Sequence, residues 1–440
     1  MAEGWLKVTA EAAKRSAIAR ASRRLLPFLV LCYGVNFLDR VNVGYAALAM
    51  NADLGFTPSI FGIGAGIFFA GYILFEIPSN LALERFGARI WIARIMISWG
   101  LVATAMALVS GETSFYLMRF LLGVAEAGFF PGIVLYLTYW FPARERARIV
   151  ALFMTAVPLA TMVGGPISGA LLEMHGFLGL KGWQRLFIIE GLPAVGLGLI
   201  ALRFLDNGPE QARWLEPEER QALTRTLAVE ADEARSVGYA DLGQALTRPR
   251  VLVLGFIYFC MVIGLYGMSF WMPQVIQTYG LSPFQIGLAT AIPYFFAAVT
   301  MVLWGAHSDR TGERIWHIAL ALLMGGAAFA WSASPLSLAL ILIALTLATS
   351  GTYAAVGTFW SLPTVILTGT GAAAGLALIN SMGNVSGLVG PPIIGVLRQE
   401  TGTFTAALLF LAGMLFLGAA ITVAFGAVER ARLARSRAVS

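Results

Sequence analysis

Twelve stretches of this chain are apolar over the length that a helix needs to cross a membrane. A bilayer with a hydrocarbon core about 30 Å thick takes roughly 20 residues of helix. Only 12% of the 440 residues are charged, against about 25% in a typical soluble protein. The sequence therefore predicts an all-α membrane protein. The expected spans are 25–47, 59–82, 91–109, 114–139, 149–172, 184–204, 251–273, 285–304, 315–333, 338–360, 372–397 and 405–427.

Positive charge is concentrated on one side of these spans. An even number of spans puts both termini on the same side, and 24 of the 30 lysines and arginines lie in the tails and loops of that side. Cytoplasmic loops carry this excess, so both termini are expected in the cytoplasm of a multi-pass plasma-membrane protein, or of a bacterial inner-membrane protein. Topology then explains the net charge of +6 without nucleic acid. A basic N-terminal segment leaves an organelle transit peptide as an alternative.

Two short segments recur at almost the same offset. Residues 84–89 match residues 309–314 at an offset of 225, and residues 166–171 match 392–397 at 226. Such self-similarity predicts two related halves, and parallel halves place a substrate site between them at mid-membrane. The expected units are a cytoplasmic tail 1–24, a six-helix bundle 25–204, a charged cytoplasmic linker 205–250, a second six-helix bundle 251–427 and a cytoplasmic tail 428–440.

Ionisable side chains inside the spans are few and lie in the first half. One such group at the bilayer centre costs about 2.5–3.5 kcal/mol, so each should face a cavity or a partner. Arg119 and Glu126 are seven residues apart and share one helix face, whereas the neighbours Asp39 and Arg40 point about 100° apart. If the first and fourth spans adjoin, two carboxylates and two guanidiniums share one cavity.

This set of side chains suits the binding of an anion together with protons. Guanidinium forks bind carboxylates, and carboxyl groups in a low-dielectric cavity can carry protons. Structural ion pairs that lock helices together are the alternative for the same residues. Glu190 and Arg94 lie near span ends and are interpreted as snorkelling or structural groups.

The polar residues at membrane depth in the second half are uncharged. Asn380 and Asn384 are one helical turn apart on one face. With Trp360, they could hydrogen-bond substrate hydroxyls, and helix-packing amides are the alternative. Tyr72 in the second span is either a core aromatic or a residue that lines the site.

Patterns for enzyme chemistry are absent from the sequence. No nucleophile or metal-ligand constellation lies at membrane depth, and no G-x-x-x-x-G-K-[ST] loop occurs for ATP. We expect no enzyme activity, no metal and no cofactor.

Several segments carry a family resemblance that covers nearly the whole chain. The sequence resembles the major facilitator superfamily and, within it, the anion:cation symporters, in particular bacterial tartrate transporters. The segments are NFLDRVNVGYAAL at 36–48, GYILFEIPSN at 71–80, RFLLGVAEAGFFPG at 119–132, YWFPARERAR at 139–148 and GNVSGLVGPPIIG at 383–395.

The resemblance implies twelve helices in two pseudo-symmetric bundles that take up an organic acid anion with protons by alternating access. In such symporters the acids matching Asp39 and Glu126 carry protons, and the arginines matching Arg40 and Arg119 engage the substrate carboxylate. Positions that match Tyr72, Trp360 and Asn380 line the site. The two loop repeats are similar to the superfamily signature, which implies a gating role for Arg85, Arg89, Asp309, Arg310, Gly312 and Arg314.

The expected function is import of a small hydroxylated dicarboxylate or sugar acid, with tartrate the first candidate. A dianion entering alone moves against about 2.3 kcal/mol per charge per 100 mV, so two or more protons should accompany it. A proton-independent exchanger or facilitator is one alternative. A non-transporting anion receptor, with the charged linker as its output, is another. We expect a monomer.

Overall fold

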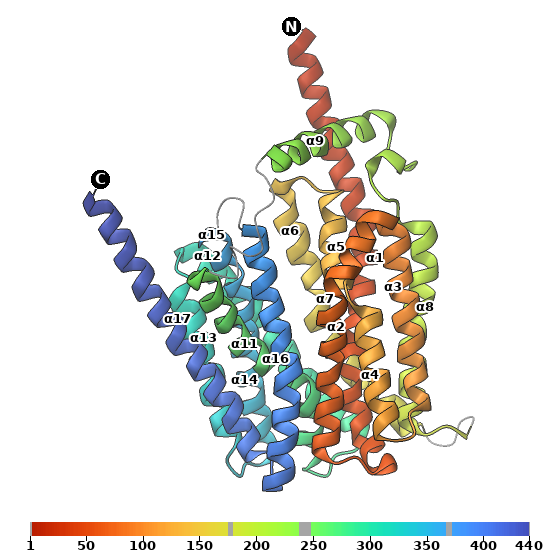
Figure 1. Cartoon of the computed structure of the whole chain (residues 1–440), viewed down its shortest axis with the longest axis vertical. Coiled ribbons are helices and arrows are strands. Elements are labelled where there is room, and N and C mark those ends of the chain that lie inside the picture. The colour runs from red at the N-terminus through yellow and green to blue at the C-terminus, as the bar shows by residue number, and fades with distance from the viewer. Residues whose placement is uncertain (1, 175–178, 237–247, 367–371, 440) are drawn as a thin grey trace.

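The computed structural model describes residues 2–174, 179–236, 248–366 and 372–439, and every regular element in these ranges is a helix (Figure 1). The first half contains α1 (Ala2–Leu54), α2 (Pro58–Phe86), α3 (Ala88–Ala105), η1 (Met106–Leu108), α4 (Glu112–Glu126), α5 (Phe129–Thr138), α6 (Ala143–Met154), α7 (Ala156–Glu173) and α8 (Gly182–Phe204). The linker contains η3 (Pro209–Gln211) and α9 (Pro217–Ser236). The second half contains α11 (Pro249–Gln277), α12 (Pro283–Thr311), α13 (Ile315–Ser332), α14 (Leu338–Phe359), α15 (Ser361–Ile366), α16 (Ala372–Thr401) and α17 (Thr405–Val439).

The prediction of an all-α membrane protein is confirmed. Within the described ranges, eleven helical stretches are long and apolar enough to cross a membrane. The remaining expected span, 372–397, lies in α16, which has 30 residues and is long enough to cross. It is less apolar because it carries Asn380, Asn384 and two consecutive prolines.

The internal repeat is visible in how two helices begin and end. Both α2 and α12 have 29 residues, and each starts with a proline after a hydroxyl residue, Thr57 or Ser282, whose side chain accepts a backbone N–H of the first turn. Each ends at a glycine with positive φ, Gly87 at 86° and Gly312 at 67°. The two helices therefore share their boundary signals at the offset of 225 found in the sequence.

The main contacts between the halves pair α2 with α16, α7 with α12, and α1 with α11. Both termini lie at one end of the molecule, which we call the termini face, and α2 and α16 converge toward the other end, the opposite face (Figure 1). Glycines allow backbones to meet there. A Cβ at Gly62 would lie 2.5 Å from the carbonyl oxygen of Pro391, and one at Gly165 would lie 2.8 Å from that of Gly287.

The linker helix α9 lies across the termini face of the first half (Figure 1). Its Glu219 accepts a hydrogen bond of 2.5 Å from Ser16 and lies 3.3 Å from Arg20 Nε. The first helix begins at Ala2, so the basic segment before residue 25 continues the helix of the first span. That extension gives α9 a surface to pack on.

Candidate functional site

A cavity of about 150 Å³ lies between the halves. Two helix interruptions lie beside the cavity. One is at Thr155, between α6 and α7, and the other is at Trp360, between α14 and α15. Its lining consists of Tyr33, Phe37, Arg40, Tyr72, Phe130, Met154, Val157, Pro158, Tyr258, Val262, Leu265, Tyr266, Met301, Tyr353, Val356, Trp360, Asn380, Gly383 and Asn384. The lining is mostly aromatic and apolar, with one permanently charged side chain, Arg40.

Arg40 and Glu126 form a buried ion pair beside this cavity. The Arg40 guanidinium donates to Glu126 Oε1 from Nε at 3.1 Å and from Nη2. Its Nη1 lies 3.5 Å from the hydroxyl of Tyr266 in the other half. Glu126 is the last residue of α4. The C-terminus of a helix carries a partial negative charge that repels a carboxylate. The positive charge of Arg40 therefore compensates both the Glu126 carboxylate and this end of α4.

Arg119 does not line the cavity in this conformation. It is 1% exposed. Its Nε donates to the carbonyl of Gly64 at 3.1 Å and its Nη2 to that of Ala65 at 3.4 Å, both in α2. The guanidinium also lies over the ring of Phe68. Here Arg119 holds α4 against α2.

Asp39 is buried away from the cavity lining. Its Oδ2 accepts the indole N–H of Trp99 at 2.8 Å, and its Oδ1 accepts the amide of Asn42 at 3.4 Å. The four ionisable residues expected in one cavity are thus distributed: one lines the cavity, Glu126 lies directly behind it, and Asp39 and Arg119 face other helices. Spacing along a helix gives the face of each residue but not its neighbour.

The uncharged residues expected at the site all line the cavity. Tyr72, Trp360, Asn380 and Asn384 come from α2, the α14–α15 break and α16. Tyr266 lines it as well, together with three tyrosines that were not predicted, namely Tyr33, Tyr258 and Tyr353. The signal that could have identified them is a phenol within an apolar span, because a buried Tyr O–H needs a polar partner.

The family follows from comparison with known proteins. Residues 29–391 match the model of the Major Facilitator Superfamily. The chain belongs to this superfamily. It is 53% identical to a candidate tartrate transporter of Agrobacterium vitis, with 91% of this chain and 89% of the relative covered. It is 41% identical to a quinolone resistance transporter of Acinetobacter baumannii, with 95% and 96% covered.

Solved structures show the same fold. The chain superimposes on a bacterial homologue of the human lysosomal transporter Spinster, in an inward-facing and occupied conformation, with a TM-score of 0.75 and 17% identity. This comparison covers 91% of the present chain and 96% of the other. As a member of the superfamily, the chain is a multi-pass transporter of the plasma membrane that moves a small molecule, and it is not an enzyme.

The residues expected to gate this superfamily member lie at the termini face, at the ends of α2 and α12. The backbone N–H of Arg89 donates to Asn207 at 3.0 Å, and Arg314 Nη1 lies 2.6 Å from Asp309. Arg85 lies over the ring of Phe86. Arg310 is exposed in the last turn of α12, one residue before the helix ends and Gly312 caps it.

Glu313 stabilises the second of these loops, residues 309–314, at the junction of α12 and α13. Burial would raise the pKa of this carboxyl, but hydrogen bonds from the backbone N–H of Trp316 and from His317 outweigh burial and lower it. The Glu313 oxygens lie 2.9 Å from the Trp316 nitrogen and 3.1 Å from His317 Nδ1. The carboxylate therefore caps the start of α13.

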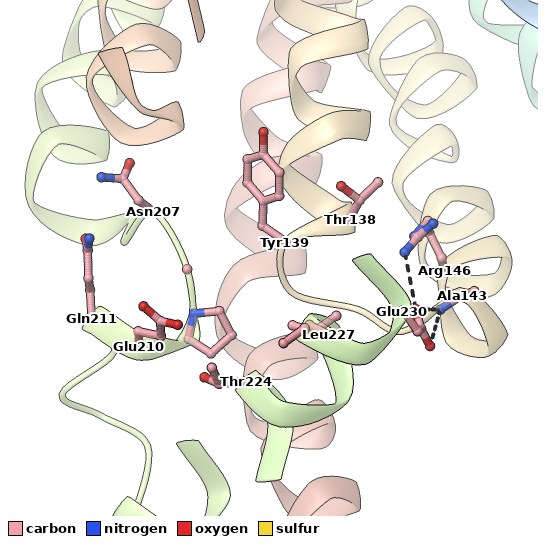
Figure 2. A pocket seen from close by; sticks show the side chains of 13 residues that line it. Thr138, Tyr139, Ala143, Arg146, Asn207, Glu210, Gln211, Thr224, Leu227 and Glu230 are labelled. Atoms are coloured by element: carbon pink, nitrogen blue, oxygen red, sulfur yellow. Dashed lines mark hydrogen bonds and ion pairs between the residues drawn. The ribbon is translucent and has the colours of Figure 1, made fainter. Parts of the chain in front are cut away.

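A larger hollow of about 880 Å³ opens at the termini face between the α5–α6 loop, η3 and α9. Figure 2 shows Glu230 of α9 reaching Ala143 and Arg146 of α6. Its carboxylate accepts the Ala143 N–H at 3.0 Å and lies 3.7 Å from Arg146. This hollow lies between the linker and the first half. None of the residues expected to bind substrate is part of its lining.

Proposed function

We propose that this transporter imports a small hydroxylated dicarboxylate, with tartrate the first candidate, together with protons. The observation that carries the proposal is the position of Arg40, whose guanidinium lines the cavity while its one paired carboxylate, Glu126, lies behind it. A guanidinium at a cavity between two halves is a fork for a carboxylate.

Competition for Arg40 supplies a coupling mechanism. When Glu126 is ionised, it occupies two donors of Arg40. When Glu126 takes a proton, the attraction is lost and the guanidinium is free for a substrate carboxylate. For one carboxylate of the substrate, the charge of Arg40 is balanced in both states, which a low-dielectric site requires.

Two further residues complete the proposed machinery. Asp39 is the second proposed proton site, and two protons match the charge of a dianion. Arg119 would reach substrate after its bonds to Gly64 and Ala65 are released, so we propose its substrate contact for another conformation.

The cavity dimensions favour a small anion over a drug-sized molecule. A volume of about 150 Å³ is below the roughly 300–1,000 Å³ of pockets for drug-sized ligands. This supports the activity named for the Agrobacterium vitis relative over that named for the Acinetobacter baumannii relative. Tyr72, Asn380 and Asn384 supply neutral hydrogen-bonding groups for hydroxyls.

Alternating access would proceed by opening the opposite face. The halves meet there through glycine contacts and through a hydrogen bond of 2.7 Å between Tyr45 and Thr290. With the termini face in the cytoplasm, as the charge bias predicts, this conformation is closed to the outside. We propose that the gating loops at the termini face join when the opposite face opens, and that one chain suffices for the cycle.

Uptake of labelled tartrate into proteoliposomes, with and without an inward proton gradient, tests this function. We expect accumulation only with the gradient, and competition by unlabelled galactonate, glucarate, malate or phthalate ranks the substrates. Equal uptake without a gradient would favour an exchanger or facilitator. Absence of uptake for every anion, together with retained binding, would favour the receptor.

A further inference from the structure

A further buried acid, Glu190 of α8, lies near Asp39 and, like Asp39, is not part of the cavity lining. Glu190 is 4% exposed and Asp39 is 1% exposed. Asn42, one turn after Asp39 on α1, donates to Asp39 and also interacts with Glu190. Ser168 of α7 donates to Glu190 Oε1 at 2.7 Å. A continuous polar chain therefore runs from Trp99 through Asp39, Asn42 and Glu190 to Ser168.

This polar chain of side chains contains two carboxyl groups, those of Asp39 and Glu190. None of the described residues that contact these carboxyls is a cation. Their partners are the indole of Trp99, the amide of Asn42 and the hydroxyl of Ser168. Glu190 Oε2 is buried and makes no hydrogen bond of normal geometry within the described part of the molecule. Two ionised carboxylates in such surroundings would each bear a desolvation cost of several kcal/mol and repel each other.

The charged groups on the neighbouring helices do not change this balance. Arg40 points to Glu126, and Glu126 acts on Asp39 as a further negative charge. Arg94 of α3 packs on the Trp91 ring at 4.1 Å. Arg185 precedes Glu190 by five residues on α8, which places it about 140° around the helix. The two carboxyls should therefore hold at least one proton between them while they are buried.

We propose that Asp39 and Glu190 share a proton that is loaded and released in each transport cycle, with Asn42 between them. The snorkelling or structural role expected for Glu190 from its sequence position is replaced in this proposal by a proton-carrying one. The inference rests on the proposed proton-coupled import and adds a proton site apart from the Arg40–Glu126 pair.

The position of Ser168 gives the proton a route to the outside. Ser168 lies between Gly165 and Gly169, the α7 residues that contact α12 at the seam closing the opposite face. Glu190 is also within electrostatic range of Tyr45, which bridges to Thr290 across the same seam. Separation of α7 from α12 would expose this end of the polar chain to water.

Glu190→Gln and Glu112→Gln separate the loss of a proton site from the mere loss of a carboxyl. The glutamine at position 190 keeps an oxygen for the Ser168 hydroxyl and cannot carry a proton, whereas Glu112 is an exposed acid at the start of α4. At an imposed difference of one pH unit with the potential clamped, each coupled proton multiplies the accumulation ratio about tenfold. We expect Glu190→Gln to lower labelled tartrate accumulation about tenfold and Glu112→Gln to leave the ratio unchanged.

Equal ratios in wild type and Glu190→Gln, or an equal loss in Glu112→Gln, would overturn the shared-proton proposal. A wild type without gradient-dependent accumulation would instead contradict the proposed function. The infrared band of protonated buried carboxyls tests the shared proton independently of transport. We expect the pH range over which this band disappears to change in Glu190→Gln, and an unchanged titration would also overturn the proposal.

Discussion

At the scale of single residues, the decisive feature is that Arg40 has competing partners. A buried ion pair is costly to form and more costly to break, because removing one member leaves an uncompensated charge. In this protein Arg40 lines a cavity. A substrate carboxylate in that cavity can therefore replace Glu126 as the partner of Arg40. The pair is suited to switching between two charge-balanced states rather than to stability.

Glu126→Gln should separate substrate exchange from proton coupling. The amide cannot take or release a proton, and it leaves Arg40 permanently free for a carboxylate. We expect gradient-driven accumulation of labelled tartrate to fall by at least about tenfold, while exchange of internal for external tartrate continues.

Glu112→Gln is the matched control for this substitution. Glu112 is an exposed acid at the start of the same helix, α4, so its loss should leave accumulation at the wild-type level. Full accumulation by Glu126→Gln would remove this carboxyl from the coupling mechanism.

At the scale of helices, the contacts between the two halves follow the internal repeat. The helix α2 packs on α16 while its repeat equivalent, α12, packs on α7. At the opposite face these contacts depend on the absence of side chains at Gly62, Gly165 and their partners. A side chain at such a position disturbs one conformational state and leaves each bundle intact.

Gly62→Val should shift the protein toward a conformation open at the opposite face. The added side chain would collide with the carbonyl of Pro391, and the helices would separate to relieve the overlap. With a cysteine at Met301, which lines the cavity, we expect faster labelling by an impermeant maleimide from that face and slower tartrate uptake.

Gly413→Val provides the comparison, because a Cβ at Gly413 meets nothing within 4 Å. It should label at the wild-type rate. Identical labelling of the Gly62 and Gly413 variants would mean that the α2–α16 contact does not close this face.

At the scale of the whole molecule, the described part of the linker up to residue 236 packs on the first half. Glu219 bonds Ser16 and Arg20 of α1, Glu230 bonds α6, and Trp214 stacks on Trp140. A receptor output would require the linker to respond to both halves. These contacts instead indicate a cap that stabilises one bundle.

Glu219→Ala should therefore lower stability and leave transport unchanged. Glu219 is 5% exposed, and losing a buried hydrogen bond to a charged group costs about 1.5–3 kcal/mol. We expect a lower melting temperature of the purified protein in detergent and an unaltered KM for tartrate uptake. The exposed neighbour Glu218, changed to alanine, should melt as wild type does. A changed KM in Glu219→Ala alone would instead connect the linker to the substrate site.

The sequence was sufficient for the fold class and the family, because each apolar span and each resembling segment is a continuous stretch of sequence. It was insufficient for the partners of the buried charges. The Arg40–Glu126 pair joins positions 86 apart, and the bonds of Arg119 to α2 depend on how the helices pack. Glu190 was interpreted as a snorkelling or structural group from its place along a span, whereas its buried neighbours are set by the packing of α1 and α7.

The small size of the cavity has a consequence for selectivity. A cavity of about 150 Å³ leaves little room for water around an anion, so an anion that enters sheds much of its hydration shell. What replaces that shell is a fixed set of phenols, amides and one guanidinium. The transporter should thus select anions by how well their hydroxyls hydrogen-bond with these groups. A smaller anion that is more strongly hydrated should be the poorer substrate.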